Sequence, residues 1–162
     1  MKELIHSYAE VLAEERELYR SLLAKAMTKK DVLVRGDIAA LEEIVRVEEE
    51  MIHLAGRLEQ KRLEYHRQLA QSLGLAEEEL SVERLITLAR DAGCELETVV
   101  SDLREILTEL GQINEINAAL IRQSLDFVNF SLRLFTGAEE GATYPGKENS
   151  ASRTARFVDR TV

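Results

Sequence analysis

Two Glu-x-x-His motifs are the residues of this chain whose types and spacing could bind a metal. They are Glu3–His6 and Glu50–His53. Bundles of the ferritin di-iron type carry such a motif on each of two helices and add a glutamate from each of two others. If the two long helices of this chain form a hairpin, the motifs lie about 18–20 Å apart along it, at 1.5 Å per residue. The last helix offers no inward-facing glutamate pair, so we expect no metal ion and no other cofactor.

Nucleophilic chemistry finds little support in the sequence. The single cysteine, Cys94, has no basic or histidine neighbour that would activate it. No phosphate-binding loop, Gly-x-Ser-x-Gly turn or Cys-x-x-Cys pair is present. We therefore expect a protein that is not an enzyme. One cysteine also excludes an intramolecular disulfide framework, which favours a reducing, cytoplasmic compartment.

The charge balance narrows the possible partners. The chain has 30 acidic and 21 basic residues, a formal net charge of −9. Nucleic acids and anionic membrane surfaces bind clustered Lys and Arg, so neither is an expected partner. No stretch approaches the roughly 20 apolar residues of a membrane span. Glu3, His6 and Glu10 interrupt any apolar run at the start, so we expect neither a signal peptide nor membrane insertion.

Two acidic runs have a simple interpretation. Glu14–Glu15 and Glu48–Glu50 are expected to be solvated faces of helices, and a docking surface for a basic partner is the alternative.

The elements that position these residues are all expected to be helices. The chain is rich in Ala, Leu, Glu and Arg and has one proline. Apolar periodicity predicts long helices over 2–33 and 38–73, a short helix over 82–90, and a long last helix that Gly137 ends. A short turn between the first two makes them an antiparallel hairpin. We predict an all-α, elongated three- or four-helix coiled-coil bundle over 1–137, with a flexible tail over 138–162.

The last helix carries the most informative pattern in the sequence. Residues that alternate in steps of three and four form a seam for a helical partner. From Phe127 onward the apolar residues spread to most faces of the helix, so something must cover them. Their position near the end of so long a helix predicts that they extend beyond the hairpin. The seam consists of Leu96, Val99, Leu103, Ile106, Leu110, Ile113, Asn117, Leu120, Ser124, Phe127, Ser131 and Leu134.

Two asparagines interrupt this apolar pattern. Asn114 and Asn117 lie at or beside the seam, where an apolar residue would pack better. Either each amide is satisfied across a closed bundle, or this half of the helix is an open groove that offers polar groups to a partner helix. The chemistry of the residues supports both interpretations equally.

The segment 110–132 resembles the FlgN-type flagellar export chaperones. The pattern N-x-x-N-x-x-L-I, followed by small and aromatic residues, matches Asn114, Asn117, Leu120 and Ile121. The long acidic first helix and the turn at Gly36 are similar to the family as well. A tyrosine followed closely by a glycine resembles the family's tail, although Pro145 comes directly after Tyr144 and residues 147–162 do not align.

This resemblance implies a cytoplasmic chaperone for the hook-filament junction proteins of the bacterial flagellum. Such chaperones hold the C-terminal coiled-coil segment of an unassembled subunit and deliver it to the type III export gate. An amphipathic client helix would lie along the last helix, with phenylalanines as anchors. Tyr144 is the expected contact with the export gate. The implied client-binding residues are Asn114, Asn117, Leu120, Ile121, Phe127, Val128, Phe130, Leu134 and Phe135.

Two alternatives remain open from the residues. A structural homodimer whose last helix pairs with its own copy explains the seam and the asparagines equally well. A ferritin-like metalloprotein is the other, and the expected distance between its motifs speaks against it.

Overall fold

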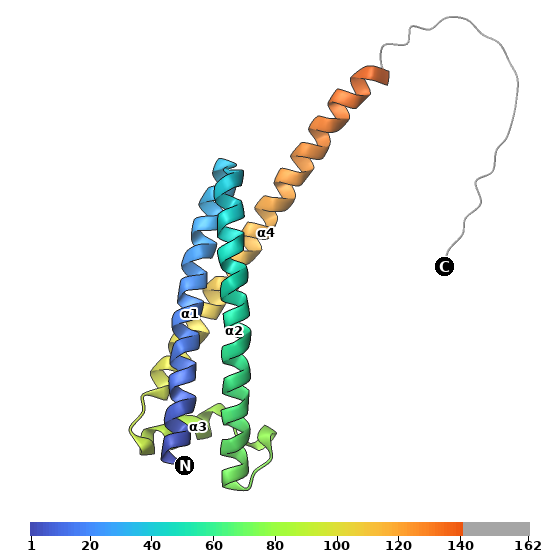
Figure 1. Cartoon of the computed structure of the whole chain (residues 1–162). Coiled ribbons are helices and arrows are strands. Elements are labelled where there is room, and N and C mark those ends of the chain that lie inside the picture. Colours follow the sequence, from blue (N-terminus) through green and yellow to red (C-terminus); the bar gives the residue numbers. More distant parts are fainter. Residues whose placement is uncertain (141–162) are drawn as a thin grey trace, which may run out of the picture. The chain divides into compact units, whose positions relative to one another are not determined.

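The computed structural model describes residues 1–140, with side-chain environments for residues 1–137, and contains no strand among them. It thereby confirms the predicted all-α fold (Figure 1). The elements are α1 (Lys2–Arg35), α2 (Ile38–Leu73), a 3₁₀ turn η1 (Glu77–Glu79), α3 (Val82–Ala92) and α4 (Leu96–Glu140).

The junction between α1 and α2 is built from two residues. Gly36 adopts a left-handed conformation with φ 68°, and its N–H donates to the carbonyl of Leu33 at 3.2 Å. Glycine tolerates this conformation because it has no Cβ. Asp37 then caps α2 by accepting a hydrogen bond from the N–H of Ala40 at 3.0 Å. The chain reverses within one turn, and α1 and α2 pack as the predicted antiparallel hairpin.

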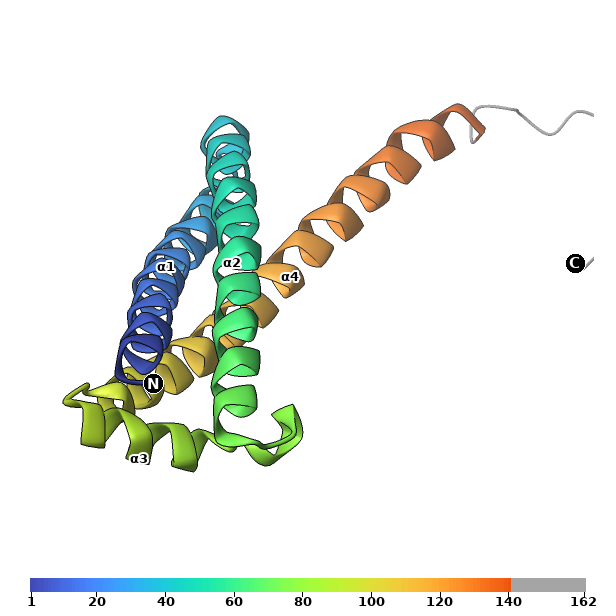
Figure 2. The ribbon, with the colours of Figure 1, turned by 60° about the horizontal axis from the view of Figure 1, so that its bottom comes forward.

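The hydrophobic core is concentrated where α1 begins and α2 ends, and α3 crosses this end of the hairpin (Figure 2). Ser81 caps α3 by accepting from the N–H of Arg84 at 3.3 Å. The Nε2 atom of His66 lies 3.1 Å from the carbonyl oxygen of Leu80, which ties the loop before α3 to α2. The buried residues of this cluster are Ile5, Tyr8, Leu12, Leu69, Ala70, Leu80, Leu85, Ala89 and Leu96.

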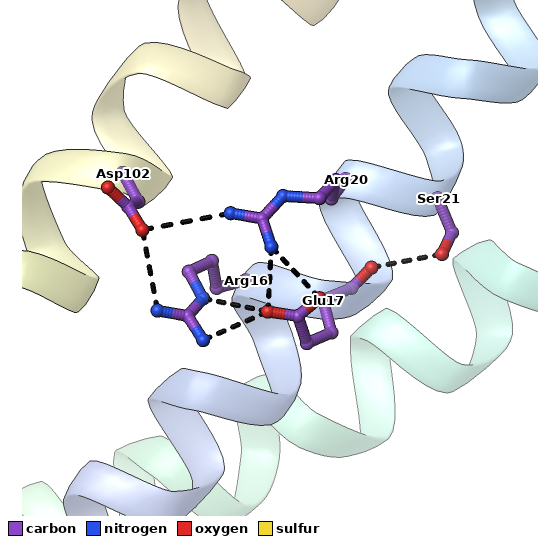
Figure 3. Close-up of polar contacts among 5 residues, drawn as sticks. All are labelled: Arg16, Glu17, Arg20, Ser21 and Asp102. Carbon is purple, nitrogen blue, oxygen red and sulfur yellow. Dashed lines mark hydrogen bonds and ion pairs between the residues drawn. The ribbon is translucent and has the colours of Figure 1, made fainter.

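The first part of α4 packs against α1. Asp102 of α4 accepts from Arg16 at 3.4 Å and lies 3.7 Å from Arg20, while both arginines also pair with Glu17 (Figure 3). Partly exposed ion pairs of this kind typically contribute about 1 kcal/mol or less each to stability. The network therefore adds little to the free energy of unfolding and mainly orients α4 on α1.

The seam predicted on α4 is confirmed in its first part, which we call the core seam. Its members Leu96, Ile106 and Asn117 are buried, and the rest are half-buried. The core seam comprises Leu96, Val99, Leu103, Ile106, Leu110, Ile113, Asn117 and Leu120. From Ser124 onward the predicted positions are exposed, except for the half-buried Ser131.

The end of α4 differs from the prediction. Gly137 was expected to stop the helix, but α4 continues through Gly137 to Glu140. A glycine inside a helix costs about 1 kcal/mol relative to alanine, and neighbouring residues with good helix propensity can outweigh this cost. The described contacts group into two compact units, Met1–Leu125 and Asp126–Val162. The predicted tail over 138–162 lies almost wholly outside the described residues, and its boundary stays a prediction.

Candidate functional site

The histidine motifs do not assemble a metal site in the described part of the chain. His6 is exposed, and its Nδ1 lies 2.8 Å from the carbonyl oxygen of Lys2 in its own helix. His53 is exposed on α2. Among residues 1–140, no three His, Cys, Asp or Glu side chains are grouped so that they could hold an ion. Nor is any helix among them long and apolar enough to cross a membrane.

The interpretation of the two acidic runs as solvated faces is wrong at one residue of each run. Glu15 is buried and pairs with Arg62 of α2 at 3.0 Å, and Glu48 is half-buried and pairs with Lys29 of α1 at 2.6 Å. Burial raises the pKa of the Glu15 carboxyl above its ordinary value, and the Arg62 guanidinium opposes this rise. The available signal was positional, because Glu15 lies seven residues after Tyr8 and seven before Leu22, in line with the buried face of α1.

The candidate functional site is the apolar surface of α4 from Leu120 onward. Phe127, Phe130 and Phe135 are 69%, 56% and 78% exposed. The predicted residues Ile121, Val128 and Leu134 are exposed as well. Residues 121–130 include no buried or half-buried position. So many exposed large apolar side chains on neighbouring turns are unusual for a monomeric surface, which makes this part of α4 the candidate interaction site.

These side chains form a wide arc around the helix axis. At 100° per residue, the apolar positions between Leu120 and Phe135 cover about 220° of the circumference. We call this surface the apolar arc; it comprises Leu120, Ile121, Leu125, Phe127, Val128, Phe130, Leu132, Leu134 and Phe135. A polar stripe covers the remaining circumference, about 140°, and holds Arg122, Asp126, Asn129, Arg133 and Thr136. Gln123, Ser124 and Ser131 are polar residues that fall within the arc.

A serine inside the apolar arc does not interrupt its apolar character. The hydroxyl of Ser124 donates to the carbonyl of Leu120 at 3.0 Å, so its donor is satisfied within α4. A partner can therefore cover this position without leaving an unpaired donor.

A second heptad pattern on α4 escaped the sequence analysis. It lies one residue after the core seam, about 100° around the helix, and we call it the open seam. From Leu107 onward each of its members is exposed. Leu125 and Leu132 belong to the open seam, although neither was among the client-binding residues predicted from the sequence. The open seam comprises Val100, Arg104, Leu107, Gly111, Asn114, Ala118, Ile121, Leu125, Val128, Leu132 and Phe135.

The two asparagines have different environments. Asn114 is exposed on the open seam, whereas Asn117 is 2% exposed and its Nδ2 donates to the carbonyl of Ala26 at 2.9 Å. Asn117 thus follows the closed-bundle interpretation in its position and its Nδ2, although its buried Oδ1 has no hydrogen-bond partner among the described atoms. Asn114 follows the open interpretation. Leu120 is half-buried at the border of the two regions. Tyr144, the expected export-gate contact, lies outside the described residues.

Comparison with known proteins agrees with these features. Neither a search of characterised proteins nor one of solved structures gave a significant match. The sequence model of the family described as "FlgN protein" matches residues 1–152. The match spans all four helices, including the apolar arc and the open seam. The chain therefore belongs to the FlgN family of flagellar chaperones.

Proposed function

We propose that this protein is a cytoplasmic export chaperone that binds the C-terminal coiled-coil segment of hook-filament junction proteins. It prevents their premature assembly and delivers them to the type III export gate. The observation that carries the proposal is the apolar arc, nine apolar residues on one helix of which all but the half-buried Leu120 are exposed. In a family of flagellar chaperones, such a surface has an obvious use in covering a client's apolar face.

The extent of the apolar arc suits this task energetically. Burying a large apolar side chain contributes about 1.5–3 kcal/mol, so the three phenylalanines together offer roughly 4–9 kcal/mol. Association of two molecules costs about 4–15 kcal/mol in lost translational and rotational freedom. Three anchors alone would barely hold a client, and the whole arc is needed for stable binding. A client helix with heptad apolar residues could lie along it in the helix-in-groove mode.

A double substitution tests this assignment. Phe127→Asp with Phe130→Asp should abolish binding of the isolated C-terminal helical segment of a hook-filament junction protein, because both rings are exposed in the free chain. Helical content and the unfolding midpoint should hardly change. Size-exclusion chromatography with light scattering, on the chain alone and with the segment, reads out the complex.

A control of equal charge lies on the polar stripe. Asn129→Asp with Thr136→Asp adds the same two negative charges to the same part of α4 and should leave binding intact. If both variants lose the complex equally, charge rather than apolar contact is responsible. If the phenylalanine variant unfolds, the rings belong to a core and the assignment fails.

Delivery to the export gate is a separate step. By resemblance to the family, we assign the gate contact to Tyr144. Tyr144→Ala should leave binding of the client segment unchanged but reduce export of the client, measured as junction protein in the culture medium. Equal loss of binding and export would place Tyr144 in client binding instead.

Self-pairing of α4 is the competing outcome. A stable homodimer that takes up no junction-protein segment would show that the apolar arc serves a structural dimer. The ferritin-like alternative is tested by metal analysis of protein purified without an affinity tag, where stoichiometric iron would support it.

A further inference from the structure

A cavity lies beside the first turns of α4, within the unit Met1–Leu125. Its volume is about 250 Å³, and all four α-helices contribute to its wall. A dry cavity of about 150 Å³ lined by apolar side chains already holds a benzene-sized molecule. The space is therefore large enough for a leucine or phenylalanine side chain. Its apolar wall consists of Leu12, Val82, Leu85, Leu96, Val100, Leu103 and Leu107.

The cavity opens to solvent between apolar and charged residues. Its exposed lining residues are Val82, Leu107, Glu59 and Arg104, whereas Leu85 and Leu96 in the wall are buried. The Glu15–Arg62 pair contributes to the wall, so its two charges are already matched. An entering apolar side chain would thus meet no unpaired charge from this pair.

The cavity is continuous with the open seam. Val100, Arg104 and Leu107 line the cavity, and they are also the first three members of the open seam. The seam then passes Gly111, Asn114 and Ala118 before it reaches the large residues of the apolar arc. A helix that follows the open seam toward the start of α4 therefore arrives at the mouth of the cavity.

Gly111 gives an independent reason to expect a close neighbour on this face. Nothing lies within 4 Å of the position that a Cβ would occupy there, so packing within the described chain does not require a glycine. Glycine is among the least favourable residues inside a helix. Small residues on a helix surface let a second backbone approach closely, which is what a partner on the open seam would do.

We infer that this cavity is a socket for one large apolar side chain of the client's helix, which lies along the open seam past Gly111. The inference rests on the proposed chaperone function and names the anchor at one end of the same site. The occupant is an amphipathic helix with apolar residues at heptad spacing and a leucine-sized or aromatic residue where it reaches Leu107.

A second copy of the chain fits this surface less well. Each copy has a formal net charge of −9, which opposes self-association. In a parallel pair each seam position faces its own copy, so Arg104 would meet Arg104 and Gly111 would meet Gly111. Such a pair would bring two like charges together and leave the cavity empty.

Filling the cavity is the direct test. Val100→Phe places a ring into the space from a half-buried position and should weaken binding of the junction-protein segment about tenfold or more. The free full-length chain should keep its unfolding midpoint. Val45→Phe is the matched control, because Val45 is exposed on α2 and does not line this cavity; its affinity should change less than about twofold. Isothermal titration calorimetry measures all three chains.

The outcomes separate this inference from the proposed function. If Val100→Phe misfolds, Leu107→Asp at the mouth takes its place with the same expected loss. Wild-type affinity in the folded filling variant would overturn the socket and leave the chaperone function standing. No binding by the wild-type chain would overturn both. A dimer of the free chain that Val100→Phe dissociates would make the second copy the occupant and overturn the inference.

Discussion

At the scale of single residues, Asn117 is the last buried residue of α4 before the exposed surface that we propose binds the client. Its Nδ2 donates to the carbonyl of Ala26, while its Oδ1 is buried and has no hydrogen-bond partner among the described atoms. Ala26 lies inside α1, so its carbonyl also has a helical partner. The side-chain amide of Asn117 therefore satisfies a donor through its Nδ2 but leaves its Oδ1 acceptor buried and unpaired.

This arrangement predicts opposite effects for two substitutions. Asn117→Leu should leave the free energy of unfolding unchanged or raise it, because it removes the buried unpaired oxygen. Asn117→Asp should lower it by about 1–3 kcal/mol or more, since a carboxylate loses the donor and faces the carbonyl of Ala26. Chemical denaturation of the free chain measures both. A destabilised Asn117→Leu would mean that the bond to Ala26 outweighs the unpaired oxygen.

Glu15 gives a prediction for the pH dependence of stability. Burial raises the pKa of its carboxyl in the folded chain above the ordinary 4.5. The Glu15 carboxyl therefore holds its proton more tightly in the folded state than in the unfolded state. Its stabilising contribution to the free energy of unfolding is complete below pH 4.5 and is lost as pH rises through the folded pKa. Relative to Glu15→Gln, the wild-type free energy of unfolding should fall across this window, measured by denaturation at several pH values. A rising difference would mean that attraction to Arg62 outweighs burial.

At the scale of elements, α4 combines two surfaces with one heptad spacing. The core seam and the open seam are offset by one residue, so they lie about 100° apart on the helix. Only the core seam was recognisable in the sequence, because the small residues Gly111, Asn114 and Ala118 interrupt the apolar pattern of the open seam. Exposure in the folded chain was needed to connect Leu107 with Leu125 and Leu132.

The exposure of the open seam in the free chain can be tested at Gly111 by measuring stability, without a client. Gly111→Ala should raise the free energy of unfolding by about 0.5–1 kcal/mol, because alanine is the better helix residue and its Cβ enters open space. Thermal and urea unfolding measure the change. A destabilised variant would reveal a close packing constraint at this position.

Two helix ends that the sequence predicted from a glycine are confirmed. Gly36 and Gly74 end α1 and α2 in the left-handed conformation, and Asp37 then caps the start of α2. Gly137 was predicted to end α4 in the same way, but the helix passes through it. The burial of Glu15 also could not be read from one helix, because its partner Arg62 comes from another.

At the scale of the whole molecule, the buried core and the proposed client site use different residues. The buried core draws on α1, α2, α3 and the core seam of α4, and among residues 1–137 none of its members lies beyond Asn117. The exposed apolar residues of the proposed client site lie mainly after Leu120. Periodicity predicted the helical bundle, and the resemblance predicted the family. The proposed contact face could be identified only from which side of α4 the other helices leave uncovered.

The loss of burial along α4 has a kinetic consequence for its backbone amides. Tertiary contacts protect amides up to about Asn117, whereas those from Ile121 onward rely on the helix alone. Amide protons exchange with solvent through local opening, which is easier where few side chains pack. In heavy water the second half of α4 should therefore take up deuterium well before the first half. The stretch of α4 in which a bound client slows amide exchange would then show, residue by residue and without any substitution, which part of the helix the client covers.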